Sequence, residues 1–320
     1  MLVLSEEDKK KIKIFAGPSS EDLAKKVSEN LGISLNLVKM NRFADGEVFI
    51  KPEESVRGCK VFVIQSTSNP VNESLMELLV FIDALRRASA EEIIAIIPYY
   101  GYARQDRTAS PREPITAKLV ANLLAEAGAT RVVTMDLHAR QAQGFFDIPV
   151  DHMEALPILA KHFIKQGFGP EDTVVVSPDV GGVKRARGLA KWLHTPLAII
   201  DKRRQKANEC EVMNIIGDVD GKKVILVDDM IDTAGTITKA ADLLKSKGAN
   251  SVRAMASHCI MSGPADERVD ASALEEIVFT DSIPYNGTSS KVKQLSVGPL
   301  FAETIRRVLK NESISSQYLI

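Results

Sequence analysis

Two adjacent carboxylates, Asp228 and Asp229, stand directly after the apolar run Val224–Val227. Such a run is typical of a buried strand in a parallel sheet, and we expect this strand to end at the acids. Paired carboxylates are acceptors that suit the vicinal hydroxyls of a sugar. Taken alone, the pair is more typical of an ordinary acidic turn, so the flanking residues decide its meaning.

A short segment after the acids has the residue types of a phosphate cradle. It consists of Asp232, Thr233, Ala234, Gly235 and Thr236, and an amphipathic helix is expected from Ile237 to Lys247. The free amides at a helix start attract phosphate, the threonine hydroxyls add donors, and glycine permits a close backbone approach. The order strand, acid pair, cradle, helix predicts a site for a sugar phosphate.

Polar residues also follow other expected strands. His138 and Asp179 each stand at a strand end, where ligands of open α/β sheets gather. One imidazole and one carboxylate could each touch a hard cation such as Mg²⁺, which takes few protein ligands. Lys202 and Arg204 follow the expected strand Leu197–Ile200, where a cationic arm could stabilise charge on a transferring phosphoryl group.

Two segments of the first half admit both a structural and a functional interpretation. The loop Pro98–Arg107 carries three tyrosines and two arginines, which could stack on a purine and clamp phosphates. Packing of the aromatic rings at a sheet end explains this loop equally well. The segment Asn41–Glu47, taken alone, predicts a hairpin turn. The chain has neither a P-loop motif nor the dinucleotide-binding glycine motif, so a nucleotide would bind without them.

The composition narrows the class of protein. A chain of 320 residues with 45% apolar residues can form two domains of ordinary size, and a net charge of −1 argues against a nucleic-acid binder. The scattered thiols of Cys59, Cys210 and Cys259 predict reduced cysteines rather than a disulfide framework. No signal peptide and no membrane-length apolar run is apparent, so we expect a cytoplasmic protein without membrane contact.

Strand-like and helix-like segments alternate along the whole chain, which indicates an α/β fold with parallel sheets. The segments Lys60–Pro98 and Lys223–His258 share the order strand, polar loop, helix, strand, so the two halves look alike. We expect one domain at 1–150 and a second at 151–300. A last helix within 301–320 is expected to pack back on the first domain.

Six motifs together make the chain similar to the ribose-phosphate pyrophosphokinase family. They are NRFADGE, PYYGYARQDR, MDLHARQAQGFFDIPVDH, SPDVGG, DKRR and VDDMIDTAGT, in the family's order. The last motif alone resembles the whole type I phosphoribosyltransferase superfamily. That superfamily includes both the enzyme that makes phosphoribosyl pyrophosphate and enzymes that consume it. The match extends from about Ile14 to Arg307.

The resemblance implies two similar α/β domains, each a mainly parallel sheet flanked by helices, as in phosphoribosyltransferases. It implies transfer of the diphosphoryl group of ATP to the 1-hydroxyl of ribose 5-phosphate, with release of AMP and with Mg²⁺ as cofactor. It also implies a homo-oligomer, at least a dimer and by family habit a hexamer, because one group of ATP contacts comes from a neighbouring subunit.

The resemblance also assigns roles to residues. Lys202 and Arg204 are implied as catalytic, with Arg204 also in the ribose 5-phosphate site. The implied ribose 5-phosphate contacts are Asp228, Asp229, Asp232, Thr233, Ala234, Gly235 and Thr236. The implied ATP contacts are Phe43, Asp45, Gly46, Glu47, Arg104 and Gln105, of which the first four belong to the neighbouring subunit. His138 and Asp179 are implied as the metal site.

Some implications concern regulation and departures from the family. Ser55, Arg57 and Arg112 resemble parts of a site at which inorganic phosphate activates family members. Arg140 and Ala142 depart from the residues expected near His138, and the added cation could alter affinity for ATP or phosphate. The alternatives are a non-catalytic regulatory paralogue, which the intact catalytic segments disfavour, and a base phosphoribosyltransferase, which the additional first domain disfavours.

Overall fold

The first unit is built around a parallel sheet made from short runs of β-branched and other apolar residues. In the computed structural model, which describes residues 11–203 and 212–315, five described strands pair in the order β1-β4-β5-β6-β7. All neighbouring pairs are parallel, and the strands are largely buried, as a parallel sheet covered on both faces must be. The strands are β1 (Ile12–Ala16), β4 (Lys60–Ile64), β5 (Glu92–Ile97), β6 (Arg131–Met135) and β7 (Val150–Met153).

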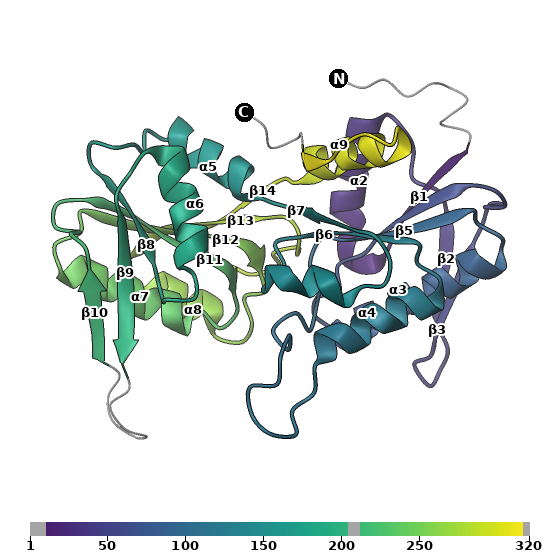
Figure 1. Ribbon diagram of the computed structural model, residues 1–320, viewed down its shortest axis with the longest axis horizontal. Coiled ribbons are helices and arrows are strands. Elements are labelled where there is room, and N and C mark those ends of the chain that lie inside the picture. The colour runs from purple at the N-terminus through teal and green to yellow at the C-terminus, as the bar shows by residue number, and fades with distance from the viewer. Residues whose placement is uncertain (1–10, 204–211, 316–320) are drawn as a thin grey trace. The chain divides into compact units, whose positions relative to one another are not determined.

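Helices from both ends of the chain cover this sheet (Figure 1). Helix α9 packs on α2, since Arg306 donates a hydrogen bond to the carbonyl of Asn30 and a Cβ added to Gly298 would lie 2.8 Å from the Cβ of Lys26. The helices are α2 (Glu21–Leu31), α3 (Val71–Arg87), α4 (Thr116–Ala127) and α9 (Gly298–Leu309), with short 3₁₀ turns at Pro18–Ser20 and Arg140–Phe145. The unit comprises Met1–Glu154, Ser282–Pro284 and Ser296–Ile320.

A separate antiparallel hairpin joins β2 (Val38–Arg42) to β3 (Val48–Pro52). The turn is closed by two hydrogen bonds of 2.9 Å, from the amide of Gly46 to the carbonyl of Phe43 and from the amide of Phe43 to the carbonyl of Glu47. Gly46 has a φ of +97°, a conformation that a residue with a Cβ rarely adopts. The hairpin interpretation of Asn41–Glu47 is therefore confirmed.

The second unit holds a longer sheet. In the described residues seven strands pair in the order β10-β9-β8-β11-β12-β13-β14, and only β10 runs antiparallel to its neighbour. The unit comprises Ala155–Asp281 and Tyr285–Leu295, and at 202–203 and 212–213 only the backbone is described. Its elements are α5 (Leu156–Lys165), β8 (Thr173–Ser177), α6 (Val183–Leu193), β9 (Leu197–Arg203), β10 (Val212–Ile216), β11 (Lys223–Ile231), α7 (Gly235–Ser246), β12 (Ser251–Cys259), α8 (Ala265–Ala271), β13 (Leu274–Thr280) and β14 (Val292–Leu295).

The main difference from the expected elements lies in β11, which does not end at the acid pair. It continues to Ile231, because it stays paired with β12 as far as Cys259. Its pairing with β8 stops earlier, at Leu226 and Val176. Asp228 and Asp229 therefore lie within a strand, at the level where one of its two neighbours has already ended.

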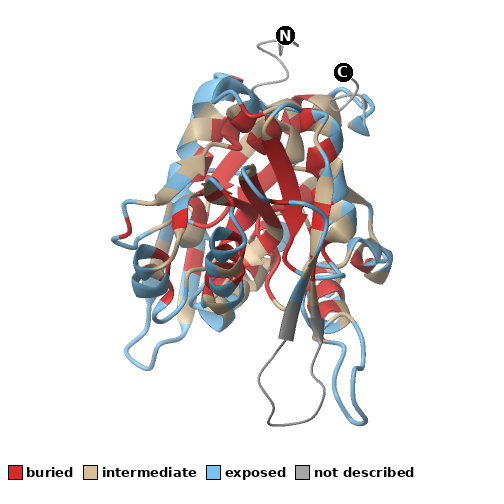
Figure 2. Cartoon of the chain, turned by 90° about the vertical axis from the view of Figure 1, so that its left-hand side faces the viewer, coloured by how far each residue is buried: buried red, intermediate tan, exposed pale blue. Residues whose placement is uncertain are grey.

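The buried residues gather on the strands of the sheets, while the outer faces of the helices and the loops are exposed (Figure 2). Cys59 and Cys259 are free thiols, as expected, and Cys210 lies outside the described residues. Among the described residues, no helix has both the length and the apolar character needed to cross a membrane.

Candidate active site

The acid pair of β11 contacts a cation from the helix that follows β8. Nη1 of Arg185 on α6 lies 3.5 Å from Oδ1 of Asp228 and 3.3 Å from Oδ1 of Asp229. The side chain of Asp229 is only 4% exposed, whereas that of Asp228 is 25% exposed. Asp228 is therefore the member of the pair that is better placed to contact a substrate, whereas Asp229 is buried.

Burial sets the protonation of this site. Burial and the adjacent Asp229 together raise the pKa of the Asp228 carboxyl to about 7, against the opposing effect of Arg185. Oδ1 of Asp228 also accepts a hydrogen bond of 2.8 Å from the amide of Asp229. Near neutral pH the Asp228 carboxyl can thus either accept a hydrogen bond from a sugar hydroxyl or donate one to it.

Arg185 was missed by the sequence analysis, although the sequence contains a signal. It lies in the first turn of α6, where a cation is unfavourable against the helix dipole unless an acid neutralises it. The acids that do so belong to β11, more than forty positions further along the chain. Arg185 can be paired with these acids only when it is known that α6 packs beside β11.

The predicted cradle is the turn from β11 into α7. Gly235 is the first residue of α7, so the amides of its first turn have no carbonyl partner within the helix. Thr233 and Thr236 are exposed beside them. Arg268 adds a cation that the sequence analysis missed, because its Nη1 donates a hydrogen bond of 2.8 Å to the carbonyl of Thr233. Exposed amides, two hydroxyls and a guanidinium make this turn suitable for an anion.

The left-handed residue of the cradle is not the glycine. Ala234 has a φ of +58° and is buried, whereas Gly235 already belongs to the helix. A Cβ at Gly235 would lie 3.4 Å from Nη1 of Arg268, at the edge of ordinary contact. Neither backbone freedom nor packing within the chain therefore requires a glycine at this position. Ala234 carries the strained conformation.

Asp179 begins the connection from β8 to α6. Its Oδ1 accepts a hydrogen bond of 2.7 Å from the amide of Gly182, and Oγ of Ser177 donates to its carbonyl at 2.6 Å. These two bonds fix the loop and leave the exposed carboxylate at the carboxyl end of the sheet. Lys202 lies on β9 by its backbone, paired with Met213. The side chain of Lys202 and the whole of Arg204 lie outside the described residues.

In the first unit, the residues at the hairpin tip are exposed. Phe43, Asp45, Gly46 and Glu47 all lie in the turn, with Phe43 57% exposed. The ring of Phe43 contacts that of Phe49 edge-to-face, with centroids 6.0 Å apart. The tip thus exposes an aromatic ring and two carboxylates to solvent at the end of the short, regularly paired β2–β3 hairpin.

The tyrosine-rich loop after β5 serves mainly as packing. Tyr99 and Tyr100 are buried, and the hydroxyl of Tyr100 donates a hydrogen bond of 2.9 Å to the carbonyl of Ala117. Stacking of these two rings on a purine is therefore wrong, and the interpretation as aromatic packing is confirmed for them. Arg104 and Gln105 are exposed beyond them on the same loop.

His138 follows β6 and is exposed. Leu137, next to it, donates its amide to Nε2 of His152 on β7 at 3.1 Å, which holds the loop against the sheet. Arg140 forms an ion pair with Glu154, so its charge is neutralised within the unit, and Ala142 is buried. In the part of the chain that the structure describes, no group of three or more His, Cys, Asp or Glu side chains is arranged to hold a metal ion.

The three residues implied in phosphate regulation are exposed in two loops of the first unit. Ser55 and Arg57 lie between β3 and β4, and Arg112 lies between β5 and α4 with a φ of +73°.

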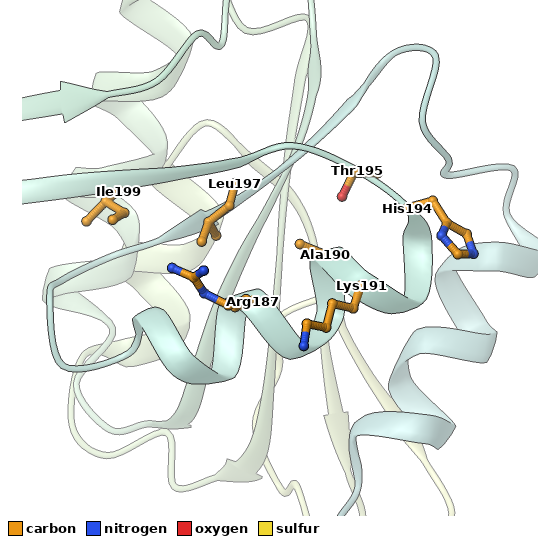
Figure 3. Close-up of a pocket in the computed structure, with 7 residues that line it drawn as sticks. All are labelled: Arg187, Ala190, Lys191, His194, Thr195, Leu197 and Ile199. Atoms are coloured by element: carbon orange, nitrogen blue, oxygen red, sulfur yellow. The ribbon is translucent and has the colours of Figure 1, made fainter. Parts of the chain in front are cut away.

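A hollow of about 710 Å³ lies elsewhere in the second unit (Figure 3). Arg187, Lys191 and His194 surround a floor formed by residues such as Leu197, at the end of α6 and the start of β9. This is the amino end of β9, whereas the acid pair and the cradle follow the carboxyl ends of strands. The hollow has no carboxylate for a sugar, so it is not the candidate site.

Parallel sheets with an acid pair, a phosphate-type helix start and cationic side chains at their carboxyl ends are typical of α/β enzymes that act on phosphorylated sugars. Residues 12–128 match the model of the N-terminal domain of ribose phosphate pyrophosphokinase. Residues 202–319 match that of the phosphoribosyl synthetase-associated domain.

Curated proteins and a solved structure agree with these matches. The ribose-phosphate pyrophosphokinase of Fusobacterium nucleatum is 59% identical over 309 residues, covering 96% of this chain and 98% of that protein. The Bacillus subtilis protein of the same name is 56% identical over 308 residues, with 96% of each chain covered. The crystal structure of phosphoribosylpyrophosphate synthetase from Mycobacterium smegmatis superposes with a TM-score of 0.88 at 45% identity, covering 94% of this chain and 99% of that one. The chain belongs to the ribose-phosphate pyrophosphokinase family.

Proposed function

We propose that the chain transfers the diphosphoryl group of ATP to the 1-hydroxyl of ribose 5-phosphate, giving 5-phosphoribosyl 1-diphosphate and AMP. Family membership over nearly the whole chain supports this activity. The observation that carries it is the turn from β11 into α7, where Asp228 precedes Gly235, the first residue of α7, by only seven residues. A sugar held by its hydroxyls at one end and its phosphate at the other requires this arrangement.

In the ribose 5-phosphate site, the 5-phosphate contacts the cradle and the ribose hydroxyls contact Asp228. The contributing residues of the cradle are Asp232, Thr233, Ala234, Gly235 and Thr236. Asp229 is assigned a supporting position, because it is buried against Arg185. The exposed threonine hydroxyls and the helix dipole both favour the anion.

ATP is assigned to two groups of exposed residues. Arg104 and Gln105 form the first group, and Phe43, Asp45, Gly46 and Glu47 at the hairpin tip form the second. We assign the second group to the ATP site of a neighbouring copy, which makes the active form at least a dimer, with a hexamer as the expected assembly.

The 1-hydroxyl oxygen of the ribose forms a bond to the β-phosphorus of ATP, and the bond from that phosphorus to the oxygen shared with the α-phosphate breaks. AMP leaves with those electrons, and the hydroxyl proton is released to water. Positioning and charge neutralisation are the main needs of such a displacement. Lys202 and Arg204 supply positive charge to the transferring group, with Arg204 also near ribose 5-phosphate.

We assign Mg²⁺ to Asp179 and His138. The exposed carboxylate of Asp179 is the oxygen ligand that Mg²⁺ prefers, and His138 is an exposed second contact. A magnesium site with few protein ligands takes its remaining positions from water and phosphate oxygens, and the ion neutralises phosphate charge when bound. Inorganic phosphate as an activator is assigned to the exposed Ser55, Arg57 and Arg112.

Product analysis tests the proposal. The protein is incubated with ATP, Mg²⁺ and ribose 5-phosphate, and AMP and the diphosphorylated sugar are quantified together. We expect AMP and the sugar product in equal amounts, and no AMP when ribose 5-phosphate is omitted. AMP formation that does not depend on ribose 5-phosphate, or no AMP at all, would overturn the assignment.

A further inference from the structure

Arg42 connects the hairpin tip to helix α3. It is the last residue of β2, directly before the turn. Its Nη2 donates a hydrogen bond of 2.6 Å to Oε1 of Glu77, and its Nη1 forms an ion pair with Glu73 one helical turn earlier. The same Nη1 lies 3.4 Å from the carbonyl oxygen of Gly46 inside the turn. One guanidinium therefore contacts the tip and the helix at once.

Glu77 continues this connection into the sheet. Its Oε2 accepts a hydrogen bond of 3.0 Å from Nε2 of Gln65, the residue that follows β4. The amide and the hydroxyl of Ser19 then donate to Oε1 of Gln65, at 3.1 and 2.8 Å. Gln65 is 1% exposed, so the series of hydrogen bonds ends in a buried part of the unit. The tip is thereby linked to the core through polar groups that each have a defined partner.

The geometry suits arginine and excludes most substitutes. A planar guanidinium can direct separate N–H groups at two carboxylates and a carbonyl, whereas a lysine ammonium acts as a point charge on a flexible stem. Glu77 is 12% exposed, and burial raises the pKa of its carboxyl. Loss of Arg42 would leave two acids of α3, Glu73 and Glu77, without this cation.

We propose that Arg42 is a positioning residue that fixes the turn Phe43–Glu47 for contact with ATP. It acts through Gly46, Glu73 and Glu77, and it does not itself contact substrate. The inference rests on the proposed role of the hairpin tip in ATP binding. Because ion pairs as exposed as Arg42 with Glu73 add little to stability, loss of Arg42 should alter the tip without unfolding the unit.

Steady-state kinetics of the full chain test the proposal. Arg42→Gln is expected to raise the KM for ATP roughly tenfold while the KM for ribose 5-phosphate stays within about twofold, because a small misplacement of contact groups weakens one substrate only. Arg42→Lys should recover part of the loss. Arg87→Gln is the matched control, since Arg87 pairs with Asp83 on the same helix at 2.7 Å and is remote in sequence from the turn. It should behave as the unaltered protein.

A double variant tests the route. If Arg42 acts through α3, Arg42→Gln combined with Glu77→Gln should raise the KM for ATP no further than Arg42→Gln alone, because residues of one network are not additive. Additive effects, or equal increases in both KM values, would contradict the positioning role.

The variant Glu47→Gln distinguishes failure of this inference from failure of the proposed role of the hairpin tip in ATP binding. An increased KM for ATP in Glu47→Gln, with Arg42→Gln unchanged, would overturn the positioning role alone. Unchanged values in both variants would overturn the role of the tip and the inference with it. A loss of thermal stability in Arg42→Gln, together with raised KM values for both substrates, would show that Arg42 only stabilises the fold.

Discussion

At the scale of single residues, the acid pair of β11 combines a substrate contact with an unusual charge state. The pKa of Asp228 is raised from 3.8 to about 7, so between these values the folded chain binds a proton that the unfolded chain has lost. The stability from this proton is fully present below about pH 3.8 and is lost as the pH rises through about 7.

Asp228→Asn should remove this pH dependence. We expect the melting temperature of the variant, relative to that of the unaltered protein, to rise between about pH 5 and about pH 8, because asparagine has no charge to bury. Calorimetry across this range measures the difference. A difference that is constant with pH would place the titration on another group.

Arg185→Met should weaken ribose 5-phosphate binding and destabilise the second unit. The substitution leaves the buried Asp229 without its cation, which costs about 2 kcal/mol after allowance for the partly exposed arginine. Titration calorimetry with ribose 5-phosphate and urea unfolding measure the two effects. Arg187→Met on the same helix is the control, because Arg187 is exposed and lines the separate hollow at the start of β9. Equal behaviour of the two variants would exclude a role for Arg185.

Lys202→Ala should lower kcat by about 10²–10³-fold, the effect of losing one well-placed electrostatic group. Binding of ribose 5-phosphate should change little, since the cradle belongs to another loop. Rapid-quench measurement of AMP in a single turnover isolates this step. Near-normal turnover in the variant would remove Lys202 from the mechanism.

Which residues could be identified from the sequence depended on how far apart in the chain their partners lie. Asp228, Asp229 and the cradle are contiguous, so their order alone indicated a sugar phosphate. Arg185 and Arg268 are brought to them by packing of helices, which no local pattern describes. The burial of Tyr100 was likewise hidden, because a ring at a strand end faces either a ligand or the core.

At the scale of elements, periodicity was a good guide to the strands and helices but a poor guide to their ends. The helix Thr116–Ala127 and the strand Arg131–Met135 follow their apolar patterns closely. Helix α3 begins at Val71, and Pro70, which lacks a donor and has a restricted φ, stands at its cap position. β11 outlasts its apolar run because hydrogen bonds to β12 continue past the acids.

Gly101→Ala should destabilise the loop after β5. A Cβ there would lie 2.4 Å from the carbonyl oxygen of Thr67, whose hydroxyl also accepts the amide of Gly101 at 2.6 Å. Backbone atoms must shift to relieve this overlap, which costs about 2 kcal/mol. Urea unfolding measures it against Gly144→Ala, where a Cβ would meet no atom within 4 Å. If the two variants unfold alike, the loop is free to move aside.

At the scale of the whole molecule, the fold class and the parallel sheets followed from the alternation of strands and helices, and the family matches agree with them. The cytoplasmic location and the expected hexamer remain predictions. Both depend on surroundings and on other copies, which a single chain does not contain.

Mixing two impaired variants tests whether copies share the ATP site. Lys202→Ala and Glu47→Gln each impair one component of it. If the hairpin tip serves a neighbouring copy, oligomers assembled from both variants contain some sites with neither substitution and should regain activity, measured as AMP formation after joint refolding. Mixtures no more active than the average of the two preparations would place the tip in its own chain's site.

The contact of α9 with α2 has a consequence for biosynthesis. Phe301, Ala302 and Ile305 of α9 are fully buried, so the amino-terminal half lacks part of its interior until α9 has been synthesised. While the ribosome is still adding the second half, the apolar surface of α2 that packs against α9 remains exposed to solvent. A nascent chain stalled before position 298 should therefore be a target for chaperones, however well its sheet has formed.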